Sequence, residues 1–270
     1  MLVSLNARIV SEEEAKIPAT DPAALYGLGV FEVLRAYRGR PFRLSDHLAR
    51  MGRSARRFGL NRRSIPPSIE EQIRELCRRN LLEDAYVRLT LTGGGNFTIV
   101  TRPLESLPRS GYRLGARVLL CESRRDPRGI LYGHKTLNYL ENVLLRDRAR
   151  KTGAADTVLL GLRGEVLEGC VSNVFLVRGG RLVTPSLDER ILPGVTRKVV
   201  LELARERDIR VQERLVKAGE LATADEVFLT NSLIEVLPIT RVGRKRISGV
   251  GPITRVLAEA YRSRVSTDLH

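Results

Sequence analysis

The sequence contains only three cysteines, Cys77, Cys121 and Cys170, and none of them forms a CxxC pair. Cysteines this few and this scattered do not form a disulfide framework, so we expect small, buried thiols. The three histidines are far apart and show no HxxxH or HExxH spacing. We therefore expect no metal site.

Long apolar runs are also lacking. No stretch approaches the roughly 20 apolar residues that cross a bilayer, and the amino terminus, MLVSLNARIVSEEEAK, has acids where a signal peptide needs a basic and then an apolar run. We expect no membrane segment and a cytoplasmic protein. With 43% hydrophobic content, 270 residues can bury a substantial core in one large or two modest domains.

Lysine is scarce although the formal net charge is +15. Only six of the 46 basic residues are lysines, namely Lys16, Lys135, Lys151, Lys198, Lys217 and Lys245. A lysine kept in an arginine-rich chain points to amine chemistry, which a guanidinium cannot perform. Lys135 fits this best, because its neighbours in LYGHKTLNYL would desolvate the ammonium and lower its pKa. The alternative is a surface lysine at the edge of a loop.

The positive charge raises the question of nucleic-acid binding, because clustered cations gain affinity for phosphate through counterion release. The basic residues are instead spread along the chain, usually near acids, with no aromatic ladder for base stacking. We expect solvated basic faces or anionic metabolites, and no nucleic-acid partner.

Hydrophobic periodicity predicts a small α+β unit in the first part of the chain. A hairpin is expected over residues 2–10, and strands over 29–37 and 85–93, with Phe31 and Val33 on one face.

Two helices are expected between these strands. One is capped by Ser45 and ends at Gly59, and the other runs from a capping box of Ser68 and Glu71 to Asn80.

Residues 101–114 contain prolines and turn residues, which predict a loop and a nearby domain boundary. The remaining expected strands are 116–123, 156–161, 173–177, 181–184, 209–213, 226–230 and 237–242, and the remaining expected helices begin near Leu140, Thr196 and Thr254.

Three segments offer hydrogen-bond donors or a cation that could hold a phosphate or another anion. In ILPGVTRKVV the amides of Val195 and Thr196 open a helix, where anions are favoured, although an ordinary cap looks the same. Asn231 and Ser232 offer donors at the end of a strand. Arg50 shares a helix face with His47 and Ser54, so it either points inward to grip phosphate or faces solvent.

Glu168, in GEVLEGC, is expected to be a buried carboxylate that needs a positive partner, such as a protonated pyridine nitrogen. The alternative is a surface glutamate in a hairpin.

Together these segments resemble the class IV (fold type IV) pyridoxal-phosphate (PLP) enzymes, which include branched-chain aminotransferases, D-amino-acid aminotransferases and aminodeoxychorismate lyases. The matching segments, in family order, are YGLGVFEVLRAY, HLARMGRSA, HKTLNYLENVLL, VLEGCVSNVFLV, TPSLDERILPGVTR and ADEVFLTNSLIEVLPI.

The resemblance implies that Lys135 carries PLP as a Schiff base and shuttles the substrate proton, and that Glu168 partners the pyridine nitrogen. The other implied cofactor residues are Arg50, Val195, Thr196 and Ser232 at the phosphate, Leu192 against the ring, and Ser172, Asn173 and Asn231 nearby. The implied substrate residues are Phe31, Tyr86, Arg88 and Tyr139.

The resemblance also implies an α+β fold, with a small N-terminal α/β sandwich domain (1–114), a connection (115–128) and a larger C-terminal β-barrel-like domain with flanking helices (129–270). A homodimer follows from the family.

We predict an aminotransferase that moves an amino group between an amino acid, or a related small amine, and a 2-keto acid through a pyridoxamine phosphate intermediate. Tyr86 and Arg88 resemble the branched-chain enzymes, whereas KTLNYLENVLL is closer to the D-amino-acid and lyase branches and FLTNSLIEVLPI to the lyase branch. Aminodeoxychorismate lyase, giving 4-aminobenzoate and pyruvate, is therefore the alternative. A non-catalytic basic binding protein is a remote one.

Overall fold

The computed structural model describes residues 1–105, 109–126, 128–247 and 249–269. They form two compact units: unit 1 holds residues 1–105, 134–138 and 269, and unit 2 holds most of the remainder. The expected division was 1–114, 115–128 and 129–270. The structure groups the chain differently, because residues 134–138 pair with unit 1 and residues 109–114 fold with unit 2.

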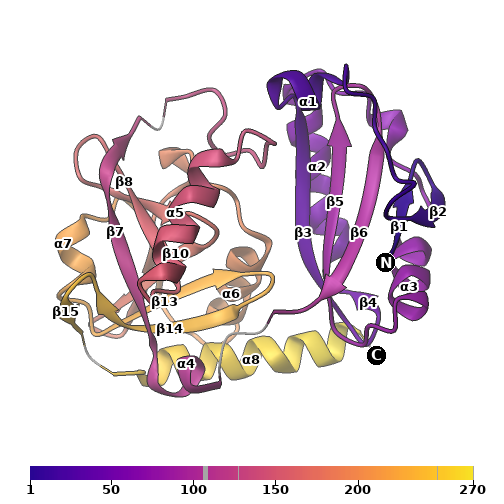
Figure 1. The fold of residues 1–270 in the computed structure, drawn as a ribbon. Coiled ribbons are helices and arrows are strands. Elements are labelled where there is room, and N and C mark those ends of the chain that lie inside the picture. Colours follow the sequence, from indigo (N-terminus) through magenta and orange to yellow (C-terminus); the bar gives the residue numbers. More distant parts are fainter. Residues whose placement is uncertain (106–108, 127, 248, 270) are drawn as a thin grey trace. The chain divides into compact units, whose positions relative to one another are not determined.

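Unit 1 is built on a six-stranded sheet in the order β2-β1-β6-β5-β3-β4, with antiparallel neighbours throughout (Figure 1). Its strands are β1 (Leu2–Leu5), β2 (Arg8–Ser11), β3 (Gly29–Tyr37), β4 (Arg40–Pro41), β5 (Ala85–Thr92) and β6 (Phe97–Pro103). The expected hairpin and both expected strands are confirmed. The expectation of a loop throughout 101–114 was wrong: β6 runs to Pro103 and α4 occupies Arg109–Leu114, while residues 106–108 lie outside the described part.

Two helices, α2 (Leu44–Arg57) and α3 (Ile69–Arg79), pack against one face of this sheet. Met51 and Ile73 join the core formed by the strands' inward residues, such as Leu34 and Leu89. The unit also contains α1 (Pro22–Tyr26) and the 3-10 turn η1 (Arg62–Ser64).

Both expected helix starts need correction in detail. Arg43 is the N-cap of α2, with φ +54°, so Ser45 lies inside the first turn and does not cap it. Ser68 is the N-cap of α3, but its hydroxyl accepts a hydrogen bond from Gln72 Nε2 at 2.8 Å and the capping box does not form.

Unit 2 is built on a nine-stranded sheet in the order β12-β11-β10-β13-β14-β7-β8-β9, with β15 paired to β14. Its strands are β7 (Ala116–Arg125), β8 (Asp156–Gly161), β9 (Val166–Gly169), β10 (Asn173–Arg178), β11 (Arg181–Thr184), β12 (Val211–Glu213), β13 (Glu226–Asn231), β14 (Glu235–Val242) and β15 (Lys245–Arg246). Only residues 170–172 separate β9, at one edge, from β10, the third strand from the other edge. So short a connection requires the sheet to curl on itself, which makes unit 2 barrel-like as expected.

The helices of unit 2 are α4 (Arg109–Leu114), α5 (Leu140–Lys151), α6 (Val195–Arg205), α7 (Ala218–Leu221) and α8 (Pro252–Asp268), with the 3-10 turn η2 at Leu187–Glu189 (Figure 1). Helix α8 packs on β13 and β14, α6 packs on β13 and on α8, and α5 packs on β7 and β8. The fold is therefore α+β. No helix in the described part of the chain is long and apolar enough to span a membrane.

Gly29 provides a test of the pairing between β3 and residues 134–138. A Cβ atom there would lie 2.5 Å from Leu137 Cδ1 and 2.8 Å from the Leu91 carbonyl oxygen. We expect Gly29→Ala to lower the free energy of unfolding by about 1–3 kcal/mol, measured by urea denaturation. Gly219→Ala is the matched control, because no atom lies within 4 Å of its Cβ. Equal unfolding midpoints for the two variants would contradict the pairing.

Candidate active site

Lys135 is positioned by a short segment, residues 134–138, that adds to the open edge at the start of β3. The Phe31 N–H donates to the Lys135 carbonyl at 2.9 Å, and the Leu137 N–H donates to the Gly29 carbonyl at 3.0 Å. Two backbone hydrogen bonds with strand-like spacing therefore fix the lysine backbone against β3.

The side chains of Lys135 and Arg88 both lie against the aromatic ring of Phe31. Its Nζ lies 4.6 Å from the centroid of the Phe31 ring, and Arg88 Cζ lies 3.9 Å from the same centroid. The ring attracts both cations and, being 2% exposed, offers an apolar surface beside the amine. Tyr86 lies two residues from Arg88 on β5 and so shares its face. Unit 1 thus brings together three of the expected residues, with Tyr86 on the same strand face.

Arg50 points inward and forms a buried pair with Glu32, a residue that the sequence reasoning missed. Arg50 Nε and Nη2 contact the two carboxylate oxygens at 2.8 and 2.5 Å, and His47 Nδ1 lies 2.8 Å from Glu32 Oε2. Burial would raise the pKa of Glu32, but the charge and hydrogen bonds of Arg50, with those of His47, lower it to about 2. The missed signal was a charged residue at an inward position of β3.

The imidazole of His47 is neutral near pH 7. Burial lowers its pKa, and the charges of Arg50 and Lys135 act in the same direction, against the opposing effect of Glu32. On the next turns of α2, Ser54 Oγ lies 3.0 Å from His134 Nδ1, so the helix also holds the segment that contains Lys135.

In unit 2, Glu168 ends β9 half-buried and is held by the segment before α6. Its Oε2 accepts a hydrogen bond from the Leu192 N–H at 3.0 Å, and Asn173 Nδ2 donates to the Leu192 carbonyl at 3.0 Å. A Cβ on Gly194 would lie 1.9 Å from Asn173 Oδ1, so any other residue there would displace the Asn173 side chain. Three expected residues therefore form one connected group.

The turn between β9 and β10 is tied to two further expected residues. Tyr139 donates its hydroxyl to the Cys170 carbonyl at 3.1 Å, and Asn231 Nδ2 donates to the Val171 carbonyl at 3.1 Å. Burial raises the pKa of Tyr139, and the charge of Glu168 raises it further. Tyr139 is therefore a hydrogen-bond donor at neutral pH. The contacts of Asn231 give it a structural role in the turn.

Asp156, at the start of β8, holds the same turn by hydrogen bonds. It was not identified from the sequence. Its buried carboxylate accepts hydrogen bonds from Ser172 Oγ and Cys170 Sγ, each at 2.6 Å, and from the Thr157 N–H at 2.7 Å. Burial raises its pKa, and the hydrogen bonds oppose that rise. The Ser172 hydroxyl is thus directed at Asp156. An aspartate at the start of DTVLLG, a strand whose other residues are mostly apolar, was the available signal.

The first turn of α6 contains a buried hydroxyl without a partner. Thr196 is 2% exposed, and its Oγ1 has no hydrogen-bond partner in the described structure. No side chain caps the helix start at Gly194. Amides at a helix N-terminus favour an anion, and an orphaned donor beside them fits one of its oxygens. Ser232, half-buried, follows β13.

Comparison with known proteins assigns the chain to a family. The amino-transferase class IV family matches residues 29–242. The chain belongs to the class IV aminotransferases. It is therefore an enzyme of a transaminase family.

Three similar proteins cover almost the whole chain. A Methanocaldococcus jannaschii protein named as a branched-chain-amino-acid aminotransferase is 37% identical, over 97% of this chain and 96% of its own. The aminodeoxychorismate lyase of Bacillus subtilis is 30% identical, over 100% and 96%. The solved structure of the branched-chain aminotransferase from Thermoproteus uzoniensis, with norvaline, has a TM-score of 0.86 and 33% identity, over 98% and 94%. The resemblance and the α+β fold are confirmed.

The buried pair of Arg50 and Glu32 yields a pH-dependent prediction. Glu32→Gln leaves a buried guanidinium without its counter-charge, so we expect the free energy of unfolding at pH 7 to fall by about 3–5 kcal/mol. Because folding lowers the pKa of Glu32 from 4.5 to about 2, its stabilisation is complete above pH 4.5 and is lost as the pH falls toward 2. The difference between wild type and variant should therefore shrink over that window in urea titrations.

Glu75→Gln, at an exposed pair with Arg78, should have little effect at either pH. A gap that is the same at pH 7 and pH 3 would contradict the account.

Proposed function

We propose that this class IV enzyme is a PLP-dependent aminotransferase in which Lys135 holds the cofactor covalently. The observation that carries the proposal is the placement of the Lys135 amine, backbone-fixed on β3 and beside the Phe31 ring. The half-buried amine lies against an apolar ring and its backbone is fixed, so it is placed to bond covalently to the cofactor.

The chain's donors suit the phosphate of PLP. Thr196 offers an orphaned hydroxyl and, with Val195, the amides of a helix start. Arg50 adds a cation whose orientation is set by Glu32, and Ser232 adds a further hydroxyl. The residues present therefore fit the group, and we propose that they form its phosphate cup.

Glu168 is proposed as the partner of the pyridine nitrogen, with Leu192 packed against the ring. The Leu192 N–H already orients the Glu168 carboxylate. We propose that three further residues support the cofactor site without touching the ring. Asn173 and Asn231 hold the backbone carbonyls of Leu192 and Val171, and Ser172 donates to the Asp156 carboxylate.

When bound, PLP supplies a conjugated cationic ring that accepts the electron pair released from the substrate Cα. Glu168 would hold the N–H of the protonated ring by a charge-assisted hydrogen bond. Lys135, freed when the donor amine takes its place, would accept the proton from the substrate Cα and serve as the acid and base of the transfer. A water molecule would release the keto acid, and the amino group would pass to a second keto acid by the same steps in reverse.

We propose that the substrate is an amino acid whose carboxylate is near Arg88, with Phe31, Tyr86 and Tyr139 shaping the pocket. Arg88 is half-buried and already ordered by stacking on Phe31 and by a hydrogen bond from Nε to Thr90 Oγ1 at 3.3 Å. An ordered guanidinium matches a carboxylate bidentately. The similarity to proteins named as branched-chain enzymes, one of them solved with norvaline, supports amino acids as donors.

Aminodeoxychorismate lyase is the second candidate, because the Bacillus subtilis lyase matches the full length of the chain. It would use the same Lys135 and Glu168 and release 4-aminobenzoate and pyruvate.

We also propose a cytoplasmic homodimer. On α5, Leu140, Val143 and Leu144 are 71%, 54% and 60% exposed, and such an apolar stripe is suited to an interface. The three cysteines are buried and form no disulfide, as is usual in a reducing compartment.

The visible absorbance spectrum of the purified protein tests the proposal when L- and then D-amino acids are added without a keto acceptor. We expect a yellow band that bleaches as pyridoxamine phosphate forms, and the active stereoisomer identifies the donor class. A band that never bleaches, together with 4-aminobenzoate release from aminodeoxychorismate, would favour the lyase. No band even after PLP is supplied would overturn the cofactor assignment.

A further inference from the structure

Unit 2 contains a hollow of about 660 Å³ whose charged lining is entirely basic. Arg117, Arg150, Arg241 and Arg246 line it, and the rest of its described lining is glycine, alanine, leucine, serine and threonine. A volume of this order matches small-molecule sites. The hollow therefore combines room for a ligand with four positive charges and no lining carboxylate.

Three of the four arginines that line this hollow are poorly neutralised by the described part of the protein. Among the described residues, the structure gives no ion pair for Arg117, Arg241 or Arg246. The Nε of Arg117 is buried without a hydrogen-bond partner, and its Nη1 reaches only the Thr152 carbonyl at 3.4 Å. A buried donor without an acceptor is costly, so an acceptor from a ligand would stabilise it.

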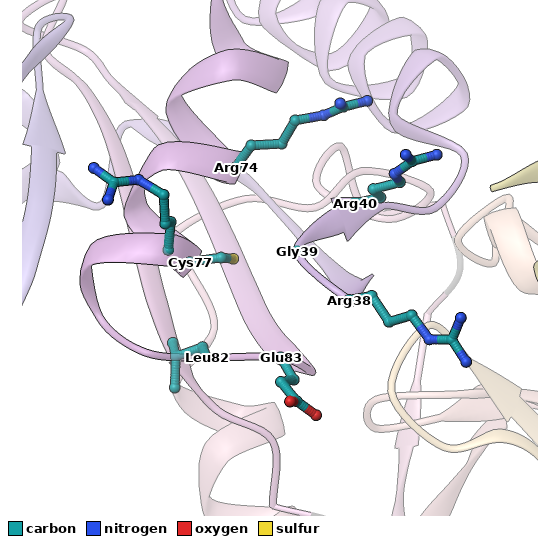
Figure 2. Close-up of a pocket in the computed structure, with 8 residues that line it drawn as sticks. Arg38, Gly39, Arg40, Arg74, Cys77, Leu82 and Glu83 are labelled. Carbon is teal, nitrogen blue, oxygen red and sulfur yellow. The ribbon is translucent and has the colours of Figure 1, made fainter. Parts of the chain in front are cut away.

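A second arginine-lined hollow, in unit 1, differs from this one in its balance of charge. It measures about 520 Å³ and includes Glu83 in its lining. Arg74 pairs with Glu70 at 2.5 Å, and Arg78 pairs with Glu75 at 2.8 Å. Figure 2 shows the Arg38 and Arg74 side chains extending in different directions. Two of its four arginines are therefore paired with acids, and a glutamate is part of its lining.

We propose that the hollow in unit 2 binds a small phosphate-bearing anion with two or more negative charges. Guanidinium groups pair bidentately with phosphate oxygens, and the concave lining of small residues leaves space for the anion.

The proposed site is separate from the proposed cofactor residues of unit 2. Asn231 pairs with Glu235 at one end of β14, whereas Arg241 lies six residues further along that strand. At roughly 3.3 Å per residue, about 20 Å separates the two positions.

Calorimetric titration of the holoenzyme with inorganic pyrophosphate, at low ionic strength, tests this proposal. We expect binding that weakens at least about tenfold in the double variant Arg241→Gln/Arg246→Gln, because charge-assisted contacts to phosphate are lost. Both side chains are exposed, so the fold should survive, and an unchanged thermal midpoint checks this. The matched control is Arg38→Gln/Arg74→Gln, which removes the same charge from the other hollow and should leave the affinity unchanged.

Three outcomes would overturn the proposal: no binding of pyrophosphate to the wild-type holoenzyme, equal weakening in both double variants, or no weakening in either. A short DNA duplex is a further comparison. If it binds more tightly than pyrophosphate and loses affinity in the first double variant, the ligand of the hollow is nucleic acid and the proposal of a small anion is wrong.

Discussion

The pairing of residues 134–138 with the start of β3 is the constraint on which the proposed chemistry depends. Two backbone hydrogen bonds, at Phe31 and at Gly29, hold Lys135 at one edge of the sheet of unit 1. Its side chain then meets Phe31, and Arg88 reaches the same ring from β5. A lysine on an unpaired loop would have many orientations, whereas this one has its backbone fixed before any ligand binds. The conformational entropy of the lysine backbone is thereby lost during folding and not during the reaction. Preorganised catalytic groups have this property.

Buried carboxylates set the positions of the other groups. Glu32 orients Arg50 inside unit 1, and Asp156 holds the turn that follows Glu168 in unit 2. Their electrostatics differ: Arg50 and His47 keep Glu32 ionised, while the hydrogen bonds that oppose the raised pKa of Asp156 come from neutral donors. Neither carboxylate is proposed to touch the cofactor. Within its own unit, a substitution of Glu32 should act through the orientation of Arg50, and one of Asp156 through the turn that follows Glu168.

Much of the fold was predictable from local pattern. Alternation along 29–37 and 85–93 placed β3 and β5, and the Pro-Gly turn before Thr196 marked the start of α6. Contacts distant in sequence were not predictable. Glu32 and Asp156 lie 15 and 14 residues from their partners His47 and Cys170, and the pairing of 134–138 with β3 spans about a hundred residues, which is why the expected domain division differed. The Ser45 cap failed because Arg43, in a left-handed conformation, began the helix earlier.

The central claim, that Lys135 holds PLP, is tested most directly by borohydride reduction of the purified protein followed by peptide mass mapping. Reduction makes the link between the cofactor and an amine permanent, so the modified residue can be located. The account predicts one phosphopyridoxyl group per chain on the peptide that contains Lys135, and none on the other five lysines. A group on a different lysine, or no group after incubation with PLP, would contradict it.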